Sequence, residues 1–410
     1  MKHLKNYCYI LPALLCAAGA VQAQESLGDQ LSKAVSDGKA SLDLRYRYEH
    51  VDQDSKSRNA KASTLRSRLT LATAPVNGFS GLLEFDDVTA VGIDDYNSTE
   101  NGKGEYPVIA DPEGTDINQV WLKWANDNAS GIYGRQRILH GNQRFIGGVA
   151  WRQNEQTYDG FRATWAPSDT GLKADLSYVY NVERIFGPDD GGNPANLRGD
   201  NIFFRADYKI NDSHSINGYA YSMEFDDQSD YAAGKTVNNS NETFGVEYAG
   251  KFDWLSLNAA YAYQSDAGDS ELDYSTNYYL IEAGASFKAV AFKVGYEVLG
   301  ADDGTGFKTP LATLHKFQGW ADKFLGTPGD GIEDMYLSAA GKLGPVKLMA
   351  VYHDFQAEDS SEDFGDELDL VATWPINKQF SIQGKYATFS SDSDRYDDTD
   401  KAWLTLQMKL

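Results

Sequence analysis

The chain has little cysteine, and both copies lie close to its start. Cys8 and Cys16 belong to the opening stretch MKHLKNYCYILPALLCAAGAVQA. Two lysines and a histidine precede its apolar run, and a small-x-small site ends it at Ala23, so residues 1–23 are predicted to be a cleaved secretory signal peptide. The remaining chain then has no cysteine, which excludes a disulfide-stapled small domain and a thiolate metal site.

Long hydrophobic runs are also missing. After Ala23 no run approaches the roughly 18 apolar residues of a membrane-spanning helix, which excludes a helical inner-membrane protein. Basic residues are scarce as well: 37 Lys and Arg oppose 60 Asp and Glu, giving a net charge of −23. Nucleic acid is therefore an implausible partner. Neither a metal-spaced histidine pair nor a nucleophile-elbow serine occurs, so we expect no enzyme, no metal site and no cofactor.

What the chain does contain is period-two alternation from Ser41 onward. In SLDLRYRYE, the leucines and tyrosines at 42–48 share one face, and Asp43, Arg45, Arg47 and Glu49 share the other. Eighteen such units follow one another down to AWLTLQMKL at the C-terminus. Each unit is close to the roughly 9–11 residues with which a tilted strand crosses a membrane.

The connections between these units alternate between short turns and long loops. APVNG, NDNAS and WPINKQ are typical short turns, whereas residues 87–118, 139–157 and 301–333 are long. This pattern predicts an all-β fold, a transmembrane antiparallel up-and-down β-barrel of eighteen strands with short periplasmic turns and long extracellular loops. A secreted β-sandwich is the alternative, but it would not require eighteen units or long loops at one end only. We expect residues 24–40 to be a short periplasmic segment and residues 41–410 to be one barrel domain.

This fold predicts the location and the partners. The barrel is expected in the outer membrane of a Gram-negative cell, as a monomer in contact with membrane lipid and lipopolysaccharide and inserted by the barrel-assembly machinery. Acidic stretches such as Asp86, Asp87, Asp94 and Asp95 are assigned to solvated external loops. In one long loop, TPLATLHKFQGWADKFLGTPG, Thr309 as N-cap, Pro310 and apolar residues at helical spacing predict a short amphipathic helix.

The arginines point to a function. Most of them fall on the polar face of the early strands or in the loop between residues 139 and 157, and a charge on the lipid face would cost roughly 2–4 kcal/mol. We therefore predict a lumenal anion path lined by Arg45, Arg47, Arg66, Arg68, Arg135, Arg137, Arg144, Arg152, Arg162 and Arg205. The predicted lumenal counter-charges are Asp43, Glu49, Asp159 and Asp207. The alternative is that these arginines only pair with wall carboxylates as a rigid ladder.

Several long blocks carry a family resemblance. They are KASLDLRYRYEHVDQD, YPVIADPEGTDINQVWLKW, GRQRILHGNQRFIGGVAWRQNEQTYDG and TPLATLHKFQGWADKFLGTPGDGIEDMYL. In these blocks the chain resembles the alginate-export family of outer-membrane porins. The resemblance implies a monomeric eighteen-stranded barrel with an electropositive constriction through which an anionic polyuronate leaves the cell. It also implies that the arginines of the GRQR, NQRF, WRQN and GFRATW segments line that constriction.

One departure from the family pattern bears on the substrate. Dedicated polysaccharide exporters, as the resemblance implies, carry a long periplasmic plug loop, whereas the last periplasmic turn here, WPINKQ, is short. Three hypotheses remain: a channel for anionic solutes such as alginate-like polymers, a general or nutrient-uptake porin for small anions and oligosaccharides, and a barrel acting as an adhesin or surface enzyme.

Overall fold

The computed structural model describes residues 26–228, 231 and 234–410. The predicted signal peptide, residues 1–23, lies outside these described residues. Lys39, two residues before the predicted start of the barrel, is the first strand residue.

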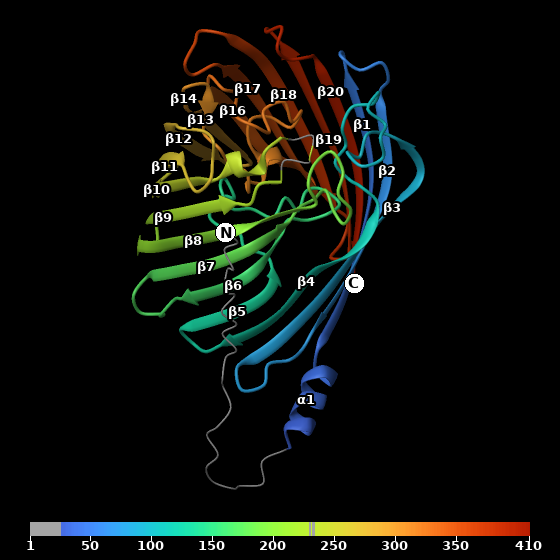
Figure 1. Cartoon of the computed structure of the whole chain (residues 1–410), viewed down its shortest axis with the longest axis vertical. Coiled ribbons are helices and arrows are strands. Elements are labelled where there is room, and N and C mark those ends of the chain that lie inside the picture. Colours follow the sequence, from blue (N-terminus) through green and yellow to red (C-terminus); the bar gives the residue numbers. More distant parts are fainter. Residues whose placement is uncertain (1–25, 229–230, 232–233) are drawn as a thin grey trace, which may run out of the picture.

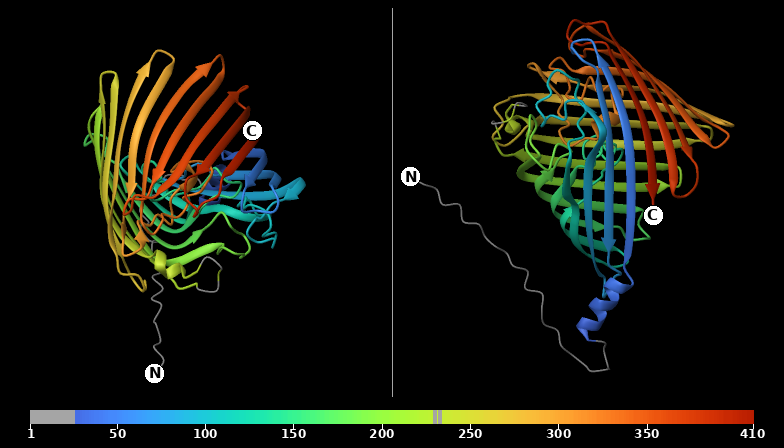
Figure 2. Two further views of the ribbon diagram at one scale, coloured as in Figure 1. Left: turned by 90° about the horizontal axis from the view of Figure 1, so that it is seen from above. Right: turned by 90° about the vertical axis from the view of Figure 1, so that its right-hand side faces the viewer.

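Eighteen antiparallel strands form one closed sheet, as the alternation predicts (Figure 1). Closure comes from β1, which pairs with β2 on one side and with β20 on the other, so no strand edge is left open. Figure 2 shows the wall curving around an interior that holds loop segments. The barrel strands are β1 Lys39–Gln53, β2 Ala60–Ala72, β3 Phe79–Asp95, β4 Gly114–Ala125, β5 Ala129–Gln136, β6 Thr157–Trp165, β7 Leu172–Glu183, β8 Asn196–Asn211, β9 His214–Phe225, β10 Asn241–Phe252, β11 Leu255–Asp266, β12 Ser275–Phe287, β13 Val290–Leu299, β16 Ile332–Leu343, β17 Val346–Gln356, β18 Asp363–Pro375, β19 Phe380–Ser391 and β20 Thr399–Lys409.

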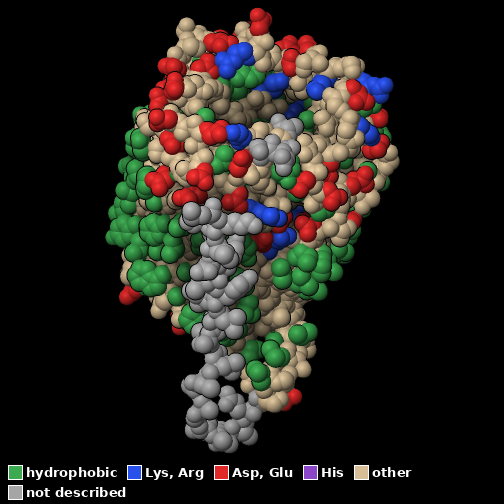
Figure 3. All heavy atoms as spheres, viewed as in Figure 1, with side chains coloured by type: hydrophobic (Ala, Val, Ile, Leu, Met, Phe, Trp, Pro, Cys, Tyr) green, Lys and Arg blue, Asp and Glu red, His purple; other side chains and the backbone are tan. Residues whose placement is uncertain are grey.

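The register places the two faces of each strand as alternation requires. Arg45 of β1 lies opposite Arg66 of β2, and both side chains are buried inside the barrel. Leu71 of β2 and Phe79 of β3 instead point outward and are exposed. Figure 3 shows hydrophobic side chains on the flanks of the barrel and acidic side chains around its loop-bearing end. The flanks are the surface that contacts lipid, and the acidic end faces outside.

Strand β3 is longer than predicted. It continues to Asp95, so the external β3–β4 loop covers residues 96–113 rather than 87–118. The acidic residues assigned to that loop therefore belong to a strand, and Asp86 is a buried lumenal residue that accepts hydrogen bonds from Arg68. Acidic clusters resemble solvated loops in sequence, and only a cross-strand partner distinguishes the two.

A short helix precedes the barrel. Helix α1, Leu27–Ser36, begins at the N-cap Ser26, whose side chain accepts a hydrogen bond from the backbone N–H of Asp29. Its C-terminal end is held at the β2–β3 turn, where the Ala74 N–H donates to the Ala34 carbonyl. Within the described residues, no helix has both the length and the apolar character needed to cross a membrane.

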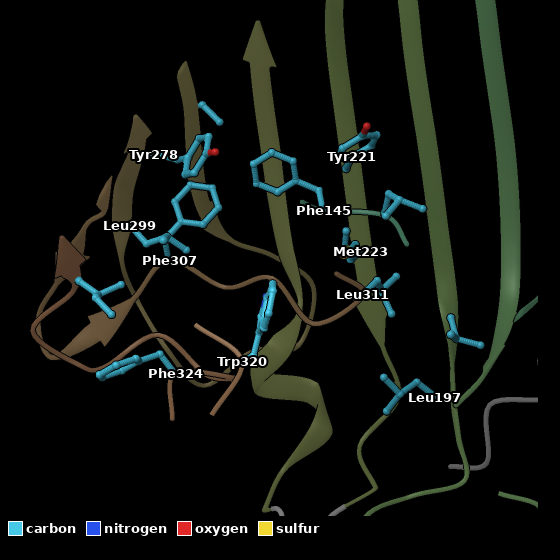
Figure 4. Packing of buried hydrophobic residues seen from close by; sticks show 14 of the residues in the cluster. Phe145, Leu197, Tyr221, Met223, Tyr278, Leu299, Phe307, Leu311, Trp320 and Phe324 are labelled. Atoms are coloured by element: carbon cyan, nitrogen blue, oxygen red, sulfur yellow. The ribbon is translucent and has the colours of Figure 1, made fainter. Parts of the chain in front are cut away.

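Two external loops fold into the barrel and supply its core. They are the β5–β6 loop, residues 137–156, and the β13–β16 loop, residues 300–331, which contains the small hairpin of β14, Ala301–Asp302, and β15, Thr305–Gly306. Figure 4 shows Phe145 of the first loop lying between Tyr221 and Tyr278 of the wall and close to Phe307 of the second loop. Apolar burial therefore fixes both loops against the inside of the wall.

The prediction of an amphipathic helix in the second loop is wrong. Only a single 3-10 turn, η2 at Leu314–Lys316, forms there, and the chain then passes through left-handed conformations at Gln318, Gly319 and Asp322. The N–H of Ala321 donates to the Glu367 carboxylate at 2.7 Å instead of to a helical carbonyl. Wall side chains thus replace the helix hydrogen bonds, which local spacing could not reveal.

Candidate functional site: the barrel lumen

Backbone hydrogen bonds join the two inner loops to each other across the lumen. The Gly147 N–H donates to the Leu311 carbonyl at 2.8 Å, and the Thr313 N–H donates to the Gln143 carbonyl at 3.1 Å. This close approach requires glycine at position 147, because a Cβ there would lie 2.3 Å from Thr313 Oγ1. The two loops therefore form a single partition inside the barrel.

Two of the predicted pore arginines hold this partition by its backbone. Arg45 donates to the Ala150 carbonyl at 2.9 Å and to Gln153 Oε1 at 2.9 Å, and Arg47 donates to the Trp151 carbonyl at 2.6 Å. Both guanidinium groups are buried. They anchor the β5–β6 loop to strand β1 and do not face open lumen.

The two arginines of the β5–β6 loop are also buried anchors. Arg144 pairs with Glu297 of β13 at 3.0 Å, and Arg152 pairs with Glu49 of β1 at 2.9 Å. Glu49, one of the predicted counter-charges, is the partner of Arg152. The β5–β6 loop folds into the barrel, and its two arginines dock it to the wall.

A cluster of lysine, histidine and tryptophan completes the docking, and the sequence interpretation missed it. His315 stacks on Trp151 with ring centroids 3.5 Å apart, and its Nδ1 lies 2.6 Å from Asp322. Lys401 of β20 donates to the same carboxylate at 2.9 Å. Burial opposes the ionisation of Asp322, but His315 and Lys401 hold its pKa well below the ordinary value.

Three arginines remain at the surface of the lumen, and each has carboxylate partners. Arg68 of β2 pairs with Asp86 at 2.5 Å. Arg137, just after β5, pairs with Glu84 and Glu155, both at 2.6 Å. The third, Arg162 of β6, pairs with Asp175 at 2.5 Å and also donates to the Arg137 carbonyl. The result is a continuous ladder along the wall from β2 to β7.

Within this ladder the cations are more exposed than the anions. The Arg137 side chain is 29% exposed while its partner Glu155 is 3% exposed, and Arg162 is 16% exposed against 2% for Asp175. The carboxylates are covered by their guanidinium partners and contribute almost no surface to the lumen. A solute at this wall therefore meets mainly guanidinium N–H groups.

Arg66 and Arg205 lie on the lumenal side but are almost completely covered. Arg66 pairs with Asp43 at 3.0 Å, and Arg205 pairs with Asp207 and with Glu247, both at 2.7 Å. Asp43 and Asp207, two of the predicted counter-charges, are the partners of these arginines.

Arg135 and Asp159 require a correction, because they lie on the outer face. Arg135 is paired in register with Val120, an exposed outward residue, and Tyr133 two positions earlier is exposed as well. Residues directly opposite each other in an antiparallel ladder share a face. Arg135 pairs outside the barrel with Asp159 at 2.9 Å and with Glu183, so it is not a pore residue. The strand ends at Gln136, and the chain then turns inward so that Arg137 faces the lumen.

A cavity of about 560 Å³ remains beside the partition, between the β13–β16 loop and the wall from β9 to β17. Lys316 and Phe317 of the loop line it together with Lys293 and Tyr336 of the wall. Lys293 was identifiable from sequence, since it lies on the polar face of AFKVGYEVL. Among the described residues no group of three or more His, Cys, Asp or Glu could hold a metal ion.

Comparison with known proteins identifies the family of this lumen. The family model described as Alginate export matches residues 39–303, well over half of the chain. The chain belongs to the alginate-export family. No curated protein matches it.

Solved structures confirm the fold at low sequence identity. OccK3 (OpdO) of Pseudomonas aeruginosa has a TM-score of 0.67 at 15% identity, covering 94% of this chain and 99% of its own. OpdK of Pseudomonas aeruginosa, solved with vanillate, has a TM-score of 0.68 at 14% identity over 92% and 99%. OccAB2 of Acinetobacter baumannii has a TM-score of 0.69 at 12% identity over 92% and 99%.

Membership of the alginate-export family fixes the broad assignment. This member is a porin of the outer membrane, surrounded by membrane lipid, and it is a channel rather than an enzyme. The predictions of fold, location and family are thereby confirmed. Which solute passes along the arginine ladder is a separate question.

Proposed function

We propose that this alginate-export family member is a diffusion channel for small anionic solutes. The supporting observation is the unequal exposure within the arginine–carboxylate ladder, where Arg137 and Arg162 face the lumen and their partners Glu155 and Asp175 lie behind them. A narrow passage walled by low-dielectric protein and lined by cations concentrates anions and repels cations.

The partition favours a small solute over a polymer. The β5–β6 and β13–β16 loops are joined by backbone hydrogen bonds and share a buried aromatic core around Phe145 and Phe307. A polysaccharide chain would have to separate them to pass. The presence of vanillate, a small aromatic carboxylate, in the related OpdK barrel is consistent with a small anion.

A general porin without charge preference is the second candidate. It is favoured by the pairing of Arg68, Arg137 and Arg162, since each guanidinium already has a carboxylate within 2.6 Å. Full pairing lowers the field that the lumen presents to a passing ion.

The reversal potential in a planar bilayer separates these two candidates. We expect the porin, in a KCl gradient, to give a reversal potential of the sign set by chloride permeation. Arg135→Gln is the matched control, because it removes an arginine from the outer face and should leave the potential unchanged. A potential near zero for the unmodified protein would favour the general porin.

A further inference from the structure

Most of the charged side chains that line the cavity beside the partition have a partner of opposite charge. Four carboxylates line it, and each lies within 3.0 Å of a basic side chain: Glu247 of Arg205 at 2.7 Å, Glu282 of Lys293 at 3.0 Å, Glu297 of Arg144 at 3.0 Å, and Asp334 of His353 at 2.8 Å. Each lining carboxylate therefore already has a basic partner within ion-pair distance.

Of the two lysines that line the cavity, Lys293 pairs with Glu282 and Lys316 lacks a carboxylate partner in the described part of the chain. Its ammonium donates to the Asn142 carbonyl at 2.8 Å and lies 5.8 Å from the centre of the Phe317 ring, but it forms no ion pair with any described residue. Burial and the nearby Lys293 lower the pKa of Lys316, and the charge of Glu282 opposes this effect. Lys316 is solvent-exposed, so an anion can reach its ammonium group and offset the repulsion from Lys293.

The surroundings of Lys316 define the rest of the ligand. Leu280, Met349 and Val351 give the cavity apolar wall, and Tyr336 and Phe317 add aromatic rings. A volume of about 560 Å³ lies within the roughly 300–1,000 Å³ of small-molecule sites. An ammonium group without a carboxylate partner, in a cavity with a largely apolar lining, suits a ligand with one negative charge and an apolar body.

We propose that Lys316 binds the acidic group of a small organic monoanion in this cavity, whose apolar part packs against Leu280 and Met349. This inference rests on the proposed function, because the anion reaches the cavity through the same lumen. It goes further by assigning a binding site on the wall opposite the arginine ladder.

The test uses benzoate as the anionic probe and benzamide as its neutral counterpart. Benzoate should reduce the chloride current through a single reconstituted channel in a saturable way, and benzamide at equal concentration should not. Lys316→Gln should weaken the benzoate effect by roughly tenfold or more, the scale of one charge-assisted hydrogen bond. Lys308→Gln removes a lysine from the same loop but outside the cavity lining, and should match the unmodified channel.

The variants separate this inference from the proposed function. Lys316→Gln should keep the anion-selective reversal potential, since Arg137 and Arg162 are unchanged. The inference is overturned if benzoate has no saturable effect, if benzamide acts equally well, or if Lys316→Gln and Lys308→Gln behave alike. If the unmodified channel shows no anion selectivity, the proposed function is overturned instead.

Discussion

Replacing Arg144 by methionine should release the β5–β6 loop from the wall. The Arg144 side chain is 2% exposed and Glu297 is 4% exposed, so the substitution leaves a buried carboxylate without its cation. Removing one partner of a buried ion pair typically costs about 3–5 kcal/mol. We expect the lower end, because Glu297 still accepts hydrogen bonds from Tyr278 at 2.7 Å and from Gln318.

A loss of about 3 kcal/mol corresponds to a roughly 100-fold larger population of the undocked loop. Trypsin cleavage after Arg152, a site of the same loop that the substitution leaves in place, reports that population in the reconstituted protein when reclosing is fast. Cleavage of Arg144→Met should therefore be roughly 100-fold faster than that of the unmodified protein. In the double variant Arg144→Met with Glu297→Met, cleavage should return most of the way, since no buried charge is left.

Arg395→Met provides the matched control. Like Arg144, Arg395 is held in ion pairs, here with the two carboxylates of Asp330 and Glu362, but its side chain is 42% exposed. An exposed pair contributes roughly 0–1 kcal/mol, so this variant should change cleavage by only a few-fold. If Arg144→Met resembled Arg395→Met, the account of Arg144 as a buried anchor would be refuted.

Two further predictions concern the loops. The β3–β4 loop docks on the β7–β8 loop, where the Gly192 N–H donates to the Thr99 carbonyl at 2.7 Å. Burial, together with Asp189 and Asp190, raises the pKa of Glu100 from its ordinary 4.5 to about 7, so the docked β3–β4 loop holds a proton that the free loop releases. Its docking should therefore weaken as pH rises from about 4.5 to 7 and stay constant above; amide exchange of this loop, compared with Glu100→Gln, checks this, and an unaltered pH dependence in the variant contradicts it. Gly147→Ala would place a Cβ 2.3 Å from Thr313 Oγ1, so we expect the two inner loops to separate and the single-channel conductance to rise; a conductance equal to that of the unmodified protein would show that the loops accommodate the methyl group.

Much of the barrel was predictable because its physics is local. Alternation of side chains along a strand needs only neighbouring residues, and the β1 residues Asp43, Arg45, Arg47 and Glu49 all face inward as their spacing requires. Turn composition and loop length likewise gave the strand count and the orientation.

The errors have separate causes. Asp159 lies two residues before the outward Phe161 on β6, so alternation along that strand itself places Asp159 on the outer face, and its lumenal assignment misread the spacing. Strand β5, by contrast, ends between Arg135 and Arg137. Two residues that share a face in an extended chain therefore lie on opposite sides of the wall. In the β13–β16 loop, Trp320 and Ala321 bond to Glu367, a residue 46 positions away from Ala321, which local sequence does not encode.

The site was predictable only in outline. Sequence placed the arginines on the lumenal face but could not divide anchors from surface residues, because that division depends on where two loops dock. Arg45 and Arg47 became anchors when the β5–β6 loop covered them, whereas Arg137 and Arg162 stayed exposed.

The central claim is that exposed guanidinium groups make this porin select anions. Arg137→Gln combined with Arg162→Gln tests it most directly, because the carboxylates left behind keep partners: Arg68 lies 2.8 Å from Glu155, and His140 lies 3.4 Å from Asp175. In a KCl gradient the double variant should move the reversal potential from the chloride side toward zero or the potassium side, with Arg135→Gln unchanged. A reversal potential identical to that of the unmodified porin would contradict the account.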